Sequence, residues 1–145
     1  MSLESWAQNA WLKKQATSAD EIRHLFRIVD RDLHDCEASG ISADTQFTIA
    51  FNAALQAATA ALRAGGYRTT GQGHHVRVID SLELTINSSS ATVQKLQILG
   101  RKRNMCSYDM AGSVSDAELQ QMKKLALELR DTVRTWIKQH HPDLL

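Results

Sequence analysis

Proline, cysteine and aromatic residues are scarce in this chain, and their scarcity narrows the possible folds. Among 145 residues there is one proline, Pro142, and there are two cysteines, Cys36 and Cys106. Because proline is excluded from helix interiors, a chain with a single proline near its end can form long uninterrupted helices. Two cysteines do not make a disulfide framework, and disulfides are rare in reducing compartments. We therefore expect a cytoplasmic protein whose fold does not depend on disulfides.

The chain also lacks a strong charge bias and a long apolar run. With 17 basic and 16 acidic residues, its formal net charge is +1. Such a balance creates no global field that would attract nucleic acid, so any contact with nucleic acid has to be local. The polar N-terminal residues do not resemble a signal peptide. Polar residues interrupt the most apolar segment, residues 45–62, so we expect no membrane span.

Small apolar residues are abundant in that same segment. It contains seven alanines and, between Asp44 and Arg63, no charged side chain. Alanine is the strongest helix former and has almost no side-chain entropy to lose. We interpret the segment as the buried central helix of a bundle. The whole chain, residues 1–145, is then predicted to be one all-α domain, an up-down bundle of five to six helices.

The remaining helices follow from three- and four-residue spacing of apolar residues and from capping signals. Ser18 with Glu21, and Ser115 with Glu118, have the spacing of reciprocal N-terminal caps. Gly40 is expected to end the second helix, and Ser90 or Thr92 to begin the fifth. The expected helices cover about residues 6–11, 18–40, 42–64, 74–84, 90–109 and 115–137.

Two segments are less regular. Residues 67–73 are polar and rich in glycine, so we predict an ordered connection without helix or strand. Residues 82–86 alternate between apolar and polar side chains, as a short strand would. Because an isolated strand would have no partner to pair with, helix is the preferred interpretation.

The segment from Arg101 to Asp109 is the most informative polar stretch. On a continuous helix, Arg101, Asn104 and Tyr108 would share one face. Arg103 follows Leu99 by four residues and Leu96 by seven, which turns it toward the buried side. An arginine so oriented needs a carboxylate or phosphate partner, because it does not lose its charge by deprotonation. The pattern predicts either a cationic pocket or an internal ion pair.

From Ser42 to the C-terminus the chain resembles the HEPN superfamily, small helical bundles associated with nucleotide and RNA chemistry in prokaryotic toxin systems. The resemblance depends on the alanine-rich helix, the Gly-Tyr-Arg connection before Gly-His-His, and the Arg103-Asn104 pair before Tyr108-Asp109. Family nucleases need no metal and use an arginine and a histidine, four to six residues apart, at a dimer interface. Here a phenol, Tyr108, occupies the position of the histidine. Tyrosine is a poor general base near neutral pH.

The resemblance therefore implies a nucleotide- or RNA-binding domain of toxin–antitoxin or defence type, with a degenerate nuclease motif and a homodimeric assembly. Arg103, Asn104 and Tyr108 are the candidate catalytic residues. With Arg101, His74 and His75 they form the candidate phosphate- or nucleotide-binding set. One alternative is an active metal-independent RNase that uses His74 or His75. Another is a non-enzymatic module that binds a nucleotidyltransferase or antitoxin partner.

A purely structural interpretation of the same residues stays open. Arg103 could pair with Asp80, Asp109 or a carboxylate of the second helix. Asn104 could cap the helix end, and Tyr108 could pack on Trp136. No cofactor or metal is expected, because His74 and His75 are adjacent and would point about 100° apart on a helix.

Overall fold

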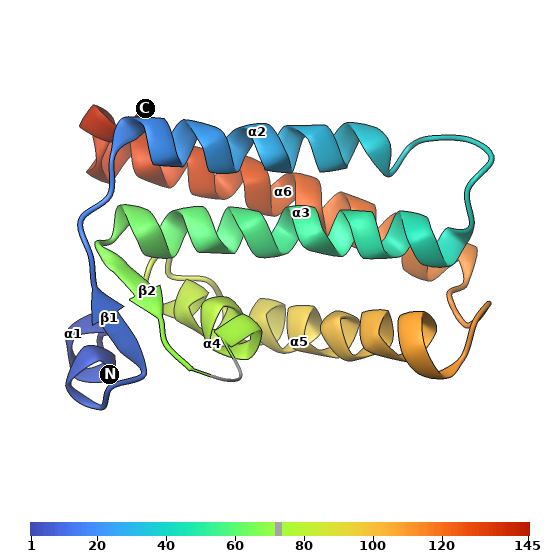
Figure 1. The fold of residues 1–145 in the computed structure, drawn as a ribbon, viewed down its shortest axis with the longest axis horizontal. Coiled ribbons are helices and arrows are strands. Elements are labelled where there is room, and N and C mark those ends of the chain that lie inside the picture. Colours follow the sequence, from blue (N-terminus) through green and yellow to red (C-terminus); the bar gives the residue numbers. More distant parts are fainter. Residues whose placement is uncertain (72–73) are drawn as a thin grey trace.

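The fold is a bundle of long antiparallel helices with a small two-stranded sheet at one end (Figure 1). The computed structural model describes residues 1–71 and 74–145, except for the side chain of Asp109. Helix accounts for 72% of the chain and strand for 4%. The prediction of an all-α helical bundle is confirmed.

Six α-helices and two short strands make up the described part of the chain. In chain order the elements are α1 (Leu3–Gln8), β1 (Leu12–Lys14), α2 (Ala19–Asp35), α3 (Ala43–Ala64), β2 (Tyr67–Thr69), α4 (His74–Asp80), α5 (Ser90–Asn104) and α6 (Asp116–His140). A 3₁₀ turn (Ser81–Glu83) follows α4, a π-helical turn (Met105–Asp109) follows α5, and a second 3₁₀ turn (Pro142–Leu144) follows α6.

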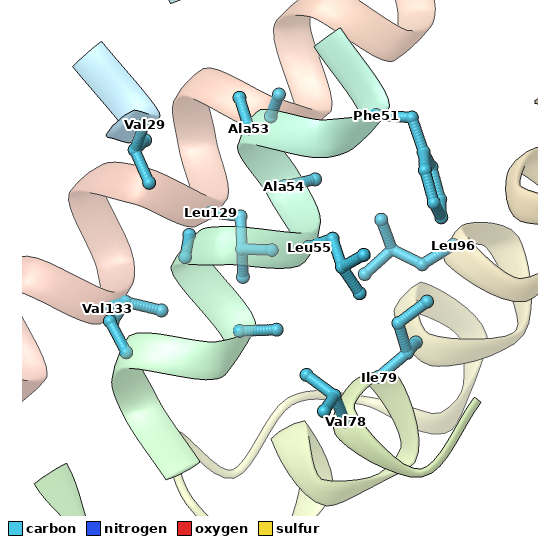
Figure 2. Close-up of a cluster of buried hydrophobic side chains, with 14 of the residues drawn as sticks. Val29, Phe51, Ala53, Ala54, Leu55, Val78, Ile79, Leu96, Leu129 and Val133 are labelled. Carbon is cyan, nitrogen blue, oxygen red and sulfur yellow. The ribbon is translucent and has the colours of Figure 1, made fainter. Parts of the chain in front are cut away.

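Helix α3 is the centre of the bundle, as its composition predicts. It packs mainly against α2 and α6, and its other side faces α4 and α5. Figure 2 shows Phe51 and Leu55 of α3 pointing toward Leu96 of α5, while Leu129 and Val133 of α6 lie on the opposite side. The α3 alanines from Ala50 to Ala64 are all buried, so neighbouring helices approach the α3 backbone closely. No described helix is long and apolar enough to cross a membrane.

The main correction to the predicted fold is the sheet. Helix α1 ends at Gln8, before Trp11, and the chain then forms β1. Strand β2 lies inside the segment predicted to have no regular structure, of which residues 72 and 73 fall outside the described part. The strands are antiparallel, with Leu12 opposite Thr69 and Lys14 opposite Tyr67. Three-residue strands are too short to show an alternating pattern, so the sequence did not reveal them.

Most predicted helix ends agree with the structure within a few residues. Ser18, Ser42 and Ser115 are N-caps, and Ser115 with Glu118 forms the full reciprocal cap. At Ser18 only half of that cap is present, because the Glu21 carboxylate binds Arg63 and Thr17 instead.

Three other ends differ. Helix α2 stops at Asp35 rather than at Gly40, which has a φ of +84° in the following loop. The cap of α5 is Ser89 rather than the predicted Ser90 or Thr92, and its hydroxyl accepts a hydrogen bond from the backbone N–H of Thr92. Helix α4 stops at Asp80, and residues 81–83 form the 3₁₀ turn instead of continued α-helix or a strand.

Candidate functional site

The end of α5 presents three of the predicted site residues to solvent. Arg101 and Asn104 are exposed, and the Tyr108 side chain is 84% exposed. The helix changes at Met105 from α to π geometry, so Tyr108 lies beyond the α-helix on which the shared face was predicted. Asn104 makes no capping hydrogen bond. Tyr108 is too exposed to pack on Trp136, whose ring stacks on that of His140 instead.

Arg103 turns toward the interior, as its spacing from Leu96 and Leu99 predicts. Its guanidinium carbon lies 5.0 Å from the centre of the Phe51 ring, a cation–π geometry. Its Nε is buried without a hydrogen-bond partner among the described atoms. The predicted partner Asp80 instead accepts a hydrogen bond of 2.9 Å from Gln97, and the side chain of Asp109 lies outside the described structure. Arg103 therefore has unused donor capacity.

The two predicted histidines lie at a different place, at the start of α4, where they line a pocket. The pocket has a volume of about 400 Å³ and lies between α2, α3, β2 and α4. The rings of His74 and His75 meet edge to face, with 4.1 Å between their centroids. Arg101, Arg103, Asn104 and Tyr108 do not line this pocket. Of the predicted set, His74 and His75 line this pocket and the four residues of α5 and its C-terminal turn do not.

Two arginines outside the predicted site complete the pocket. Arg63 is in the last turn of α3, where its Nη1 donates to Oε1 of Glu21. Arg68 is on β2, and its Nη1 donates to Oε1 of Gln15 over 3.0 Å. The Gly65-Gly66 turn between them reverses the chain, and Gly66 has a φ of +93°, which favours glycine. A Gly-Gly turn with an arginine on either side is the sequence feature from which Arg63 and Arg68 could have been predicted to lie close together.

The pocket combines an apolar floor with a polar rim. Four buried side chains form the floor: Leu25, Leu55, Leu62 and Val78. The rim adds the side chains of Gln56, Thr59 and Thr69 to the two arginines and two histidines. Apolar surface beside a few convergent polar groups is typical of small-molecule sites. A ligand that fits this lining has an anionic group and an apolar part.

The electrostatics of the rim favour an uncharged His75 at neutral pH. Partial burial is the largest cause that lowers the pKa of His75, followed by the neighbouring His74 and the positive charge of Arg103. Helix α5 packs against α4 on this side, where Nε2 of Gln97 donates to the backbone carbonyl of Val76 over 2.9 Å. A neutral imidazole can accept a hydrogen bond or a proton, whereas the arginines only donate.

Among the described residues, no three His, Cys, Asp or Glu side chains lie close enough together to hold a metal ion. No known family, curated protein or solved structure matches this chain. The residues of the site are therefore what indicates a function.

Proposed function

We propose that this chain is a HEPN-like, nucleotide- or RNA-binding domain of toxin–antitoxin or defence type, and that the pocket beside α4 receives the phosphate-bearing ligand. The observation that carries the proposal is the convergence of Arg63, Arg68, His74 and His75 on one pocket with an apolar floor. The planar guanidinium of arginine can donate two hydrogen bonds to phosphate oxygens, and the nucleobase of a nucleotide can lie on apolar side chains. Catalysis is not required for this function.

A binding experiment with an Arg68 variant tests the proposal. AMP and a fluorescein-labelled oligoadenylate are titrated into the protein at 50 and 200 mM salt. Arg68→Ala should weaken binding about tenfold or more, because a charge-assisted contact to phosphate is lost. The control is Arg27→Ala, which removes an exposed arginine of α2 that does not line the pocket. Equal binding by wild type and Arg68→Ala would reject the pocket as the ligand site.

One observation favours the alternative of an active metal-independent RNase. The lowered pKa of His75 leaves a neutral imidazole that could accept a proton, and the charge of Arg103 acts on it. If this alternative holds, the wild type cleaves RNA in the presence of EDTA and His75→Ala does not. Absence of cleavage across several RNA substrates would eliminate it.

Another observation favours a partner-binding module. Ile98, Met105, Tyr108 and Met110 are large apolar side chains that remain exposed on α5 and just after it. A homodimer, or a complex with a nucleotidyltransferase or antitoxin, would cover them. If so, Ile98→Glu should dissociate the complex in light scattering or abolish co-purification of that partner. A wild-type monomer that co-purifies with no such protein would count against this function.

A further inference from the structure

Arg63 differs from the other cations of the pocket because a carboxylate of the same chain already neutralises it. Its Nη1 donates to Oε1 of Glu21, at the first turn of α2. The second oxygen of Glu21 accepts a hydrogen bond of 2.9 Å from the Thr17 hydroxyl. Arg68, by contrast, donates to the neutral amide of Gln15, which does not offset its positive charge. Among the described residues that line the pocket, Arg68 therefore offers its positive charge to a ligand while Arg63 remains paired with Glu21.

The Glu21–Arg63 pair is accessible enough to open. The side chains are 25% exposed for Arg63 and 30% for Glu21. Ion pairs that remain in contact with water contribute little to stability, since both charges are well solvated when apart. Arginine binds a carboxylate and a phosphate through the same donors. A phosphate that enters the pocket therefore competes with Glu21 for the same guanidinium.

We propose that Glu21 is an internal competitor for the anion site, and that a small organic phosphate monoester displaces it from Arg63. This inference rests on the proposed function and adds its regulation and ligand class. The phosphate lies between Arg63 and Arg68, and the organic part lies on the floor formed by Leu25, Leu55 and Leu62. A volume of about 400 Å³ is suited to a single small ligand.

The test replaces the competing charge and keeps its shape. AMP, inorganic phosphate and adenosine are titrated calorimetrically into wild type and Glu21→Gln at pH 7.5. Glu21→Gln should bind AMP about three- to fivefold more tightly, because the pocket gains a second uncompensated cation. Adenosine binding should be unchanged, and AMP should bind more tightly than inorganic phosphate. The control is Asp20→Asn. It removes a carboxylate in the same helical turn as Glu21, but that carboxylate pairs with Arg23, so AMP affinity should be unchanged.

A second variant separates competition from misfolding. Thr17→Val removes the other anchor of Glu21 without changing any charge, so it should also increase AMP affinity, by a smaller factor. Circular dichroism and a thermal melt confirm the fold of each variant.

The two proposals fail in different ways. If Glu21→Gln binds AMP equally or more weakly while Arg68→Ala still loses binding, Glu21 only positions Arg63 and this inference alone is overturned. If the wild type and Glu21→Gln bind neither AMP nor phosphate, both this inference and the proposed function are overturned. AMP binding that appears only in Glu21→Gln would support this inference, and Arg68→Ala in the Glu21→Gln background, which should lose that binding, would then test the proposed function.

Discussion

The imidazole of His75 couples the pocket to pH. Partial burial, His74 and Arg103 together lower its pKa from the ordinary value of 6.5. The unfolded chain therefore binds this proton more readily than the folded protein does, and stability rises with pH across that interval. We predict that the free energy of unfolding falls as pH decreases below about 6.5, and that His75→Gln reduces this dependence.

Urea unfolding at half-unit steps from pH 7.5 to 5 measures the slope. His24→Gln, which removes an exposed histidine of α2, is the matched control and should keep the wild-type slope. A His75→Gln slope identical to that of the wild type would show that the environment of His75 does not differ between the folded and unfolded states.

Gly100 lies against the ring of Phe51, next to the site of Arg103. A Cβ atom at position 100 would lie 3.0 Å from Cζ of Phe51 and 3.3 Å from Cε1. The ring is 2% exposed, so it has little room to move. Alanine would favour the helix by somewhat less than 1 kcal/mol, but overpacking costs about 1–3 kcal/mol. We therefore predict a net loss of about 1 kcal/mol for Gly100→Ala.

Chemical denaturation checks this value. Gln94→Ala, at an exposed position of α5, should change the free energy of unfolding by less than about 0.5 kcal/mol. A Gly100→Ala protein more stable than the wild type would mean that the Phe51 ring shifts freely.

The β1–β2 pair determines where Arg68 lies. Leu12 is 3% exposed and opposite Thr69, so its side chain fixes the sheet to the core beside the pocket. Leu12→Ala should cost about 2–4 kcal/mol through loss of buried apolar contact. Because Arg68 and Thr69 are on the partner strand, AMP affinity should also fall. Thermal unfolding and calorimetry measure both effects.

The exposed neighbour Lys14 provides the control, since Lys14→Ala removes a side chain from the same strand without opening the core. Destabilisation by Leu12→Ala with unchanged AMP affinity would show that Arg68 is positioned without the sheet.

Local and non-local signals explain which elements the sequence could predict. The caps at Ser42 and Ser115 and the alanines of α3 act within a few residues, so helix positions follow from them. Strands β1 and β2 have no local periodicity, and their pairing joins segments separated by two long helices. The same reason applies to the site. The inward orientation of Arg103 follows from helical spacing. Arg63, Arg68 and His74, however, come together at one pocket only because β2 pairs with β1 and α4 packs back against α3.

The molecule as a whole depends on the small side chains of α3. Ala57 is completely buried on the helix that packs against α2 and α6. A leucine there would force helix backbones apart, because well-packed interiors do not absorb three extra carbon atoms without strain. Ala57→Leu should therefore destabilise the protein by about 1–3 kcal/mol, a large part of the stability of a domain this size. Ala91→Leu, at an exposed position of α5, should have little effect in the same urea titration. Equal stability of the two variants would contradict the view that close approach at α3 holds the bundle together.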